Sequence, residues 1–369
     1  MEKKIGVGIV GASPLNPGWA VAAHIPALQA LPEHYELKAV STSRPESAKA
    51  AEKEFGVPAY DNNTDLINHP EVDLVVVAIK LPNHYEVVSE AIDAGKMVYC
   101  EWPLGKGLEE SLELAKQAEE ANVRTVIGLQ ARFNPVFKYL RDLINDGYIG
   151  ELSGTSMVGS GMAWGDVIDQ SNAYILDDDN GVNMLSIAIM HTVDAMMYML
   201  GDIKHVSAET AVRIPETTIQ ETGETVNKTT PDQVAFFGTL ESGAMMSVHY
   251  HGGVSRGENL QWTIRGSEGE LVLTSNHGQA QMADNLKVYG ATGDETELRE
   301  LKVPEEYFES SSQIPEGHYH NVGRVYLQFA KDLRDGTHLA SDFTDAIKNH
   351  KLLDAIEKAD AAGEKQPVE

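Results

Sequence analysis

Cysteine and long apolar runs are scarce in this chain of 369 residues. Its one cysteine, Cys100, excludes an internal disulfide framework and a cysteine-based metal cluster, which suits a reducing compartment. No stretch reaches the roughly 18 to 20 apolar residues that span a bilayer. The N-terminal residues MEKKIGVGIV also lack the longer apolar run and small-residue cleavage site of a signal peptide. We therefore expect a cytoplasmic protein without membrane contact.

Basic residues are scarce as well. The chain has 29 Lys and Arg against 56 Asp and Glu, a net charge of −27 at pH 7. A surface of this sign repels phosphate backbones and anionic membranes, so we expect no direct binding to nucleic acid. A solvated, self-repelling surface that favours solubility is the simpler interpretation of this acidity, and a specific cationic partner is the alternative.

The first 130 residues alternate between short apolar runs and helical patterns. The apolar runs begin at Lys4, Tyr35, Val72, Met97 and Arg124. The candidate helices lie between them, near residues 18–31, 44–55, 83–94 and 108–121. Near-continuous apolar strands alternating with helices are typical of a parallel, doubly wound sheet. We therefore predict an α/β domain with a doubly wound parallel sheet over residues 1–130.

The pattern changes after residue 130. A helix is predicted near 134–146, followed by alternating strands joined by polar, Gly-rich connections, which are typical of an antiparallel sheet. The segment from Met184 to Leu200 is apolar on nearly every side, so we expect a buried helix there. Two more helices are predicted near 320–334 and 342–361. We predict an α+β domain with an open, mainly antiparallel sheet over residues 131–369, its C-terminal helices packing back on the first domain.

The turn after the first strand has the features of a pyrophosphate-binding loop. Gly8 and Gly11 end the strand and Gly18 opens the next helix, while Ser13 replaces the usual middle glycine and residues 14–17 lengthen the loop. Glycines here let a pyrophosphate approach the backbone at a helix N-terminus. A plain strand-to-helix turn is the alternative, but the position of this loop as the first βα turn favours a nicotinamide dinucleotide.

The second strand ends in STSRPESA, without the acidic residue that commonly binds the ribose hydroxyls of NAD. Ser43 and Arg44 instead offer a hydroxyl and a guanidinium that could hold a 2′-phosphate. An exposed loop with an ordinary arginine is the alternative. We therefore favour NADP over NAD as the cofactor.

A metal site is not expected. His249 and His251 lie on one face of a predicted strand, a spacing that could hold a metal ion. Neither a nearby cysteine nor a defined third ligand accompanies them.

Six segments together resemble the glucose-fructose oxidoreductase, inositol dehydrogenase and MocA family. They are HIPAL from His24, AIDAGKMVYCEWPL from Ala91, GLQARFNP from Gly128, GYIGEL from Gly147, HTVDAMMYMLG from His191 and IRGSEGELVL from Ile264. The lengthened loop ending in GWA, with HYEVV, EWPL and NGV, is most similar to the family branch of the fungal galactose-regulon repressor. The resemblance implies a Rossmann domain paired with an open-sheet domain, a small sugar or polyol as substrate, and a homodimer or homotetramer.

Motif and resemblance together indicate a set of cofactor-binding residues. They are Gly8, Gly11, Ser13, Gly18, Trp19, Ser43, Arg44, Ile79, Asn83, His84, Glu101 and Gln130.

Two residues depart from the family's active-site pattern. Trp102 occupies the position of the lysine expected to assist proton transfer, and Ile187 occupies that of an aspartate four residues before His191. Residues four apart share a helical face, so an aspartate there could act on a substrate hydroxyl together with the histidine. His191 remains as the candidate proton acceptor, because hydride transfer from a carbinol needs a base. A packed core histidine is the competing interpretation.

Other pocket candidates rest on weaker evidence. Arg132 lies within the matched segment GLQARFNP, and Trp164 could stack on a sugar ring or pack in the core. Lys80 and Lys106 follow predicted strands, whose carboxyl ends face the ligand crevice, but surface solvation is the preferred interpretation of Lys106.

Two functions remain open from the sequence. The first is an NAD(P)-dependent oxidoreductase with a non-standard active site; the second is a catalytically silent, nucleotide-binding sensor that would need a protein partner. We favour the enzyme, because nothing in the sequence reveals such a partner.

Overall fold

The computed structural model describes residues 3–283, 285–309, 311–314, 317 and 319–369. The chain divides into two compact units. Unit 1 comprises Met1–Gln130 and Glu309–Lys348, and unit 2 comprises Ala131–Phe308 and Asn349–Glu369. Unit 1 is therefore built from two separate stretches of sequence.

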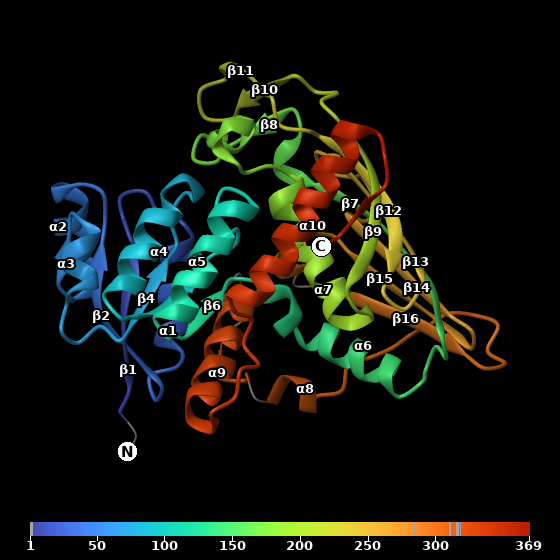
Figure 1. The fold of residues 1–369 in the computed structure, drawn as a ribbon, viewed down its shortest axis with the longest axis horizontal. Coiled ribbons are helices and arrows are strands. Elements are labelled where there is room, and N and C mark those ends of the chain that lie inside the picture. The colour runs from blue at the N-terminus through green and yellow to red at the C-terminus, as the bar shows by residue number, and fades with distance from the viewer. Residues whose placement is uncertain (1–2, 284, 310, 315–316, 318) are drawn as a thin grey trace. The chain divides into compact units, whose positions relative to one another are not determined.

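Unit 1 contains a six-stranded parallel sheet in the order β3-β2-β1-β4-β5-β6 (Figure 1). Its strands are β1 (Ile5–Val10), β2 (Tyr35–Ser41), β3 (Ala59–Tyr60), β4 (Leu74–Val77), β5 (Met97–Cys100) and β6 (Thr125–Ile127). All four residues of β4 are buried, as expected of a strand covered on both faces. The strand order reverses between β1 and β4, and ligands bind at such switch points. The predicted doubly wound parallel sheet is confirmed.

Helices join and cover these strands. They are α1 (Ile25–Gln29), α2 (Pro45–Phe55), α3 (Asn63–Ile67), α4 (His84–Asp93), α5 (Leu108–Glu120) and α9 (His320–Asp335). The helix expected over 18–31 is instead a π-helical turn, η1 (Ala20–His24), followed by the short α1. Pro26 explains the difference, because it has no N–H with which to continue an α-helical pattern, and Ile25 N–H bonds Ala20 O instead.

Unit 2 is built on a nine-stranded sheet in the order β17-β16-β15-β14-β7-β13-β12-β9-β18. Its longer strands are β7 (Leu152–Gly161), β9 (Ile203–Ala211), β12 (Gln233–Leu240), β13 (Met245–Gly252), β14 (Leu260–Gly266), β15 (Gly269–Ser275) and β16 (Lys287–Thr292). Two short strands, β17 (Arg299–Glu300) and β18 (Gln366–Pro367), lie at its edges. Only β7 and β13 are paired in parallel among the described strands of this sheet, so it is mainly antiparallel as predicted.

Alternation along these strands separates a buried face from an open one. Phe236, Tyr250 and Trp262 point into the core, where the Phe137 ring of α6 (Pro135–Asn145) lies 6.0 Å from the Trp262 ring. Their neighbours Phe237 and Met245 are exposed. The sheet is thus covered on one side, which is the arrangement of an open sheet.

The remaining elements of unit 2 complete its architecture. The apolar segment from Met184 forms a π-helical turn, η7 (Leu185–Ile189), that leads into α7 (Met190–Leu200), and nearly all of α7 is buried. A three-stranded sheet contains β8 (Val167–Ile168), β10 (Glu216–Ile219) and β11 (Thr225–Asn227). The last helices are α8 (Glu306–Glu309) and α10 (Phe343–Ala362), which begins in unit 1 and belongs to unit 2 from Asn349 onward. No described helix combines the length and apolar character that a membrane crossing requires.

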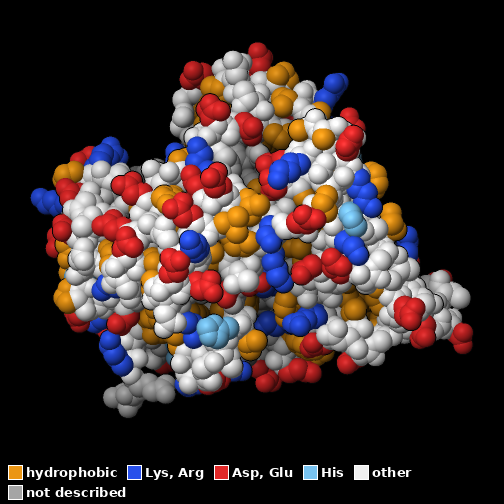
Figure 2. Space-filling view, in the orientation of Figure 1, with side chains coloured by type: hydrophobic (Ala, Val, Ile, Leu, Met, Phe, Trp, Pro, Cys, Tyr) orange, Lys and Arg blue, Asp and Glu red, His pale blue; other side chains and the backbone are white. Residues whose placement is uncertain are grey.

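Acidic side chains are spread widely over the face shown in Figure 2. Lys and Arg lie among them instead of forming one basic patch. This distribution matches the solvated surface expected from the net charge of −27.

Candidate functional site

Two glycines at the end of β1 and in the turn after it are required by packing. Gly11 has φ of +94°, and a Cβ there would lie 2.7 Å from both Ala78 O and Ile79 Cγ2. A Cβ on Gly8 would lie 2.9 Å from Leu66 Cδ2. Both positions therefore need glycine for packing within unit 1, and Ile79 contacts the turn directly.

Gly18 has no such internal reason to be glycine. A Cβ there would meet no atom within 4 Å, and its φ is not in the left-handed region. The next residue, Trp19, carries an indole N–H that is buried without a hydrogen-bond partner among the described residues. Buried donors are nearly always satisfied in folded proteins. Ser13 is half-buried in the same loop and donates its N–H to Gly11 O at 3.1 Å. A glycine that internal packing does not require, next to a buried donor without a partner, fits a turn that receives a ligand.

The carboxyl end of β2 separates into buried and exposed side chains. The Ser41 hydroxyl donates to Asn63 Oδ1 at 2.9 Å, and Thr42 accepts from the Ser47 hydroxyl at 2.9 Å. Ser43 and Arg44 are exposed. The Arg44 Nε lies 3.5 Å from the exposed Glu46 carboxylate, a surface pair that contributes little and leaves the guanidinium accessible to a ligand.

His84 is buried and faces the chain's own backbone. Its Nδ1 lies 2.8 Å from Pro103 O, and its Nε2 lies 3.0 Å from Ile79 O. Burial lowers the pKa of His84, although the two carbonyls act in the opposite direction. In this structure the imidazole connects the end of β4 to the segment after β5, while Asn83 beside it is exposed.

The segment after β5 holds Glu101 in a fixed position. Gln130 Nε2 donates to both carboxylate oxygens, at 3.1 and 2.8 Å, and His24 Nε2 lies 3.0 Å from Oε1. A Cβ on Gly128 would lie 2.6 Å from Oε1, so the carboxylate rests directly on that glycine. Glu101 and Gln130, two predicted cofactor ligands, are therefore adjacent, whereas His24 was not among the predicted site residues.

The residue at the family's lysine position is a tryptophan that belongs to unit 1. Trp102 is buried, and an indole cannot supply the positive charge or the titrating group of a lysine. Lys80 and Lys106 are both exposed, as solvated surface lysines would be.

In unit 2, His191 lies on α7 with 5 % of its surface exposed. Ile187 is half-buried in the π-helical turn that precedes this helix. We expected positions 187 and 191 to share one helical face, as they would in a regular α-helix. In the turn that contains Ile187, however, Ile189 N–H bonds Met184 O, which is one residue further back than in an α-helix.

Arg132 is engaged in a buried ion pair. Its Nε donates to Asp194 Oδ2 at 2.9 Å, and its Nη2 makes a second bond to Oδ1. Asn349 Nδ2 donates to the same carboxylate at 2.9 Å. Sequence reasoning missed Asp194, although a lone charge in the apolar segment HTVDAMMYMLG was a signal that a buried partner must exist.

Trp164 is enclosed by unit 2, with 2 % of its surface exposed. Its carbonyl accepts from the Lys228 ammonium at 2.7 Å, and that ammonium lies 3.1 Å from Asp232. Burial acts to raise the pKa of Asp232, but hydrogen bonds from Ile214 N–H and Lys228 hold the pKa below its usual value. The Trp164 indole N–H has no partner among the described residues. The ring therefore packs in the core in this structure.

The two histidines on β13 are differently placed. His249 is exposed on the open face of the sheet, whereas the ring of His251 contacts Ser255 Oγ at 3.0 Å and Gly252 O at 3.1 Å. Within the described part of the chain, no three His, Cys, Asp or Glu side chains are arranged to hold a metal ion.

Two protein families match the chain in succession. Residues 5–129 match the oxidoreductase family with an NAD-binding Rossmann fold, and residues 135–275 match the C-terminal domain of Gal80p. The boundary between the two matches falls near residue 130, where the sequence pattern changes.

Individual relatives include both an enzyme and a regulator. The chain is 32% identical over 287 residues to dehydrogenase aclE of Aspergillus oryzae, covering 74% of this chain and 77% of that protein. It is 29% identical over 308 residues to the galactose/lactose metabolism regulatory protein GAL80 of Saccharomyces cerevisiae, covering 78% of this chain and 71% of that protein.

Solved structures show the same fold. A super-repressor mutant of Gal80p from Saccharomyces cerevisiae has a TM-score of 0.88 and 25% identity, covering 99% of this chain and 98% of the other. Levoglucosan dehydrogenase in complex with NADH has a TM-score of 0.84 and 22% identity over the whole of both chains.

Proposed function

This chain belongs to the oxidoreductase family of glucose-fructose oxidoreductase, inositol dehydrogenase and MocA, and we propose that it transfers hydride between a nicotinamide cofactor and a sugar or polyol. The observation that carries the proposal is the turn after β1, where a glycine without a packing role adjoins the unsatisfied Trp19 donor. A bound nicotinamide would supply the hydride acceptor. Gly18 and Trp19 would hold the pyrophosphate, and Glu101 and Gln130 would face the nicotinamide half.

We assign to His191 the role of accepting the hydroxyl proton of the substrate. An alcohol that loses a hydride must also lose its hydroxyl proton, and an imidazole nitrogen is a group that can accept it. Arg132, whose guanidinium holds Asp194, supports the helix that carries His191. The substrate role of Trp164 would require its indole N–H to reach a ligand oxygen.

A nucleotide-binding regulator without catalysis is the second candidate. Buried Trp102 in place of the family lysine is the specific observation in its favour, together with similarity to GAL80. Such a protein would use the same cofactor residues and act through a protein partner.

Binding and turnover of the purified protein distinguish these candidates. Calorimetric titration with NADPH, NADP⁺, NADH and NAD⁺ should show binding, with the 2′-phosphorylated pair bound more tightly because Arg44 is accessible. Absorbance of the reduced nicotinamide is then followed against a panel of sugars and polyols. Turnover supports the oxidoreductase, binding without turnover supports the regulator, and absence of binding overturns both.

Gly18→Ala should weaken nucleotide binding without harming the fold. The added methyl meets no atom of the protein, so the unfolding midpoint should not fall. If the pyrophosphate lies against this glycine, overpacking should lower affinity by about tenfold, roughly 1.4 kcal/mol. Gly257→Ala is the matched control, because that glycine also lacks neighbours and a left-handed φ. Equal affinities for both variants would remove Gly18 from the site.

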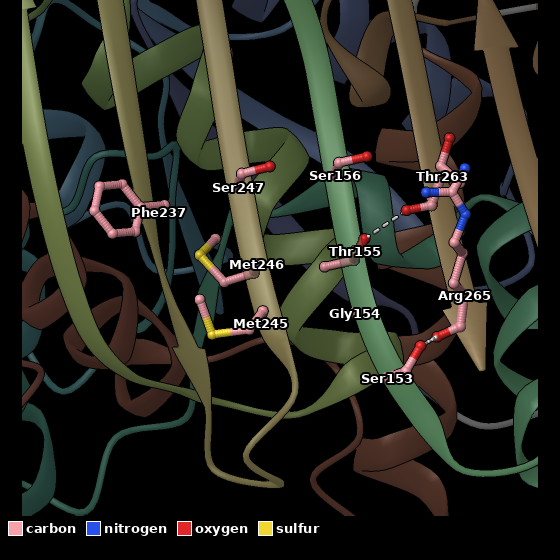
Figure 3. Close-up of a pocket in the computed structure, with 10 residues that line it drawn as sticks. All are labelled: Ser153, Gly154, Thr155, Ser156, Phe237, Met245, Met246, Ser247, Thr263 and Arg265. Carbon is pink, nitrogen blue, oxygen red and sulfur yellow. Dashed lines mark hydrogen bonds between the residues drawn. The ribbon is translucent and has the colours of Figure 1, made fainter. Parts of the chain in front are cut away.

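We also propose that the open face of the nine-stranded sheet joins two copies of this chain. Apolar side chains are exposed on three adjacent strands: Val158 on β7, Met245 on β13 and Phe237 on β12. Figure 3 shows Phe237, Met245 and Ser247 beside one another on this face. Two shallow hollows, of about 360 and 410 Å³, lie over the same strands. An apolar patch of this kind on a soluble protein is typical of an interface, and a two-fold axis would place it against itself.

Phe237→Lys should convert that dimer to monomers. The side chain is 56 % exposed and lies among the other apolar residues of the face, so a charge there would be buried on association. Sedimentation velocity measures the outcome. Leu339→Lys is the control, because Leu339 is 65 % exposed but belongs to unit 1 and is not part of this sheet. Dimers that survive the Phe237 substitution would contradict this interface.

A further inference from the structure

A buried chain of three side chains in unit 1 ends on the Glu101 carboxylate. His24 Nε2 lies 3.0 Å from Glu101 Oε1, and His24 Nδ1 lies 2.8 Å from the hydroxyl of Tyr326 on α9. His24 and Tyr326 have no exposed surface, whereas the Glu101 side chain is 13 % exposed. We call these three residues the carboxylate relay. Its exposed end is the only part that a ligand can reach.

The direction of hydrogen-bond donation along the relay follows from the carboxylate at its end. A carboxylate has no proton to donate, so His24 Nε2 donates to Glu101, and a neutral imidazole with its proton on Nε2 accepts at Nδ1. Burial raises the pKa of Tyr326 well above its ordinary value, and Tyr35 and Glu101 add to this effect. The phenol therefore keeps the proton that it donates to His24 Nδ1.

Neighbouring rings and backbone hold the side chains of the relay in place. The His24 ring meets the Tyr99 ring edge-on at 5.0 Å and the Tyr326 ring edge-on at 5.8 Å. On the other side, Gly128 lies directly beneath the carboxylate. Because both donors to Glu101, Gln130 and His24, are themselves held by the fold, the remaining lone pairs of the carboxylate point in fixed directions.

The position of Glu101 in the sheet indicates what those lone pairs bind. Glu101 directly follows β5, in the half of the sheet formed by β4, β5 and β6. Dinucleotides bind across the carboxyl ends of the strands, one nucleoside to each half, and the turn after β1 and the end of β2 take the pyrophosphate and the adenosine. The second half is left for the nicotinamide nucleoside, whose ribose hydroxyls and carboxamide N–H are donors suited to a carboxylate.

We propose that His24 and Tyr326 are positioning residues that hold Glu101 ready to accept a hydrogen bond from the nicotinamide nucleoside. This inference rests on the proposed function, since it needs a bound nicotinamide nucleotide. The relay ends at a fully buried phenol, so it orients the carboxylate and offers no route for protons to solvent.

Two substitutions of His24 separate positioning from general packing. The amide nitrogen of glutamine extends about as far from the backbone as Nε2 and can still donate to Glu101, whereas that of asparagine stops near Nδ1. We expect His24→Gln to keep NADH affinity within about threefold and His24→Asn to lose about tenfold, as for a lost charge-assisted hydrogen bond. The double variant Glu101→Gln, His24→Asn should bind NADH no more weakly than Glu101→Gln alone, because His24 acts through the Glu101 carboxylate.

Three ligands locate the effect within the nucleotide. Calorimetry uses ADP, ADP-ribose and NADH, or their 2′-phosphorylated forms if the protein selects them. His24→Asn should leave ADP affinity unchanged. If the variant binds both ADP-ribose and NADH more weakly, the ribose hydroxyls are the donors to Glu101. If only NADH binds more weakly, the carboxamide N–H is the donor. Equal losses for ADP and NADH, no loss for either, or a glutamine variant as weak as asparagine would overturn the proposal. A wild-type protein that binds none of the three overturns the proposed function and this inference together.

Discussion

Asp194→Ala should lower the free energy of unfolding by about 3–5 kcal/mol. The Asp194 side chain has no exposed surface and the Arg132 side chain is only 14 % exposed, so the substitution removes a buried carboxylate that pairs with a guanidinium in the interior. It also removes the acceptor of Asn349 Nδ2. Urea unfolding followed by circular dichroism measures the change as a lower midpoint.

A second ion pair of similar length provides the control. Arg334 Nε and Asp335 Oδ1 are 3.0 Å apart, but both side chains are more than one third exposed. Asp335→Ala should therefore change stability by less than about 1 kcal/mol. Replacing the buried pair together, with Arg132→Met and Asp194→Leu, should recover much of the loss because both buried charges are then removed. A loss below about 1 kcal/mol in Asp194→Ala would show that water or another group replaces the carboxylate.

His191→Gln should reduce turnover by about 10²- to 10⁴-fold, the usual contribution of a general base. The amide keeps a polar group of similar size on α7 but cannot accept and release a proton near neutral pH. Cofactor affinity should stay within about threefold, because His191 is not among the predicted cofactor-binding residues. The measurements are kcat on the best substrate of the panel and calorimetry with the preferred nucleotide.

His249→Gln is the matched control for this prediction. That histidine is exposed on the open face of the sheet, so its replacement should leave kcat unchanged. A His191 variant that unfolds more readily and loses cofactor affinity in proportion would identify a core histidine. Unchanged turnover would assign the proton to another group.

The fold of unit 1 was accessible from the sequence because its strands are short, continuous apolar runs separated by long helical patterns. The two-residue β3 and the five-residue α3 were not predicted, since segments of that length contain too little periodicity to recognise. The π-helical turn after Gly18 was also missed. Pro26 was visible in the sequence, but its effect on the helix depends on where the preceding turn begins.

The candidate site was accessible only in part, because its polar contacts join distant residues. Glycines and exposed side chains at strand ends could be placed from local patterns, as with Gly11 and Arg44. The partners of His24, by contrast, lie 77 and 302 positions away along the chain, and Arg132 meets Asp194 across 62 positions. No local pattern encodes such pairs. The assignments of His191 and of the cofactor residues, and the division into functional domains at residue 130, stay predictions.

The two-part construction of unit 1 has a consequence for the synthesis of the protein. Tyr35 donates its hydroxyl to Tyr326 O, and Ile127 N–H bonds Ser341 O, so the first 130 residues need partners from the segment 309–348. All of residues 131–308 must be translated between these two parts. At about 5–20 residues per second, the nascent parallel sheet waits roughly 10 to 40 s for α9 to cover α1. During that interval the apolar surface that α9 later covers stays exposed.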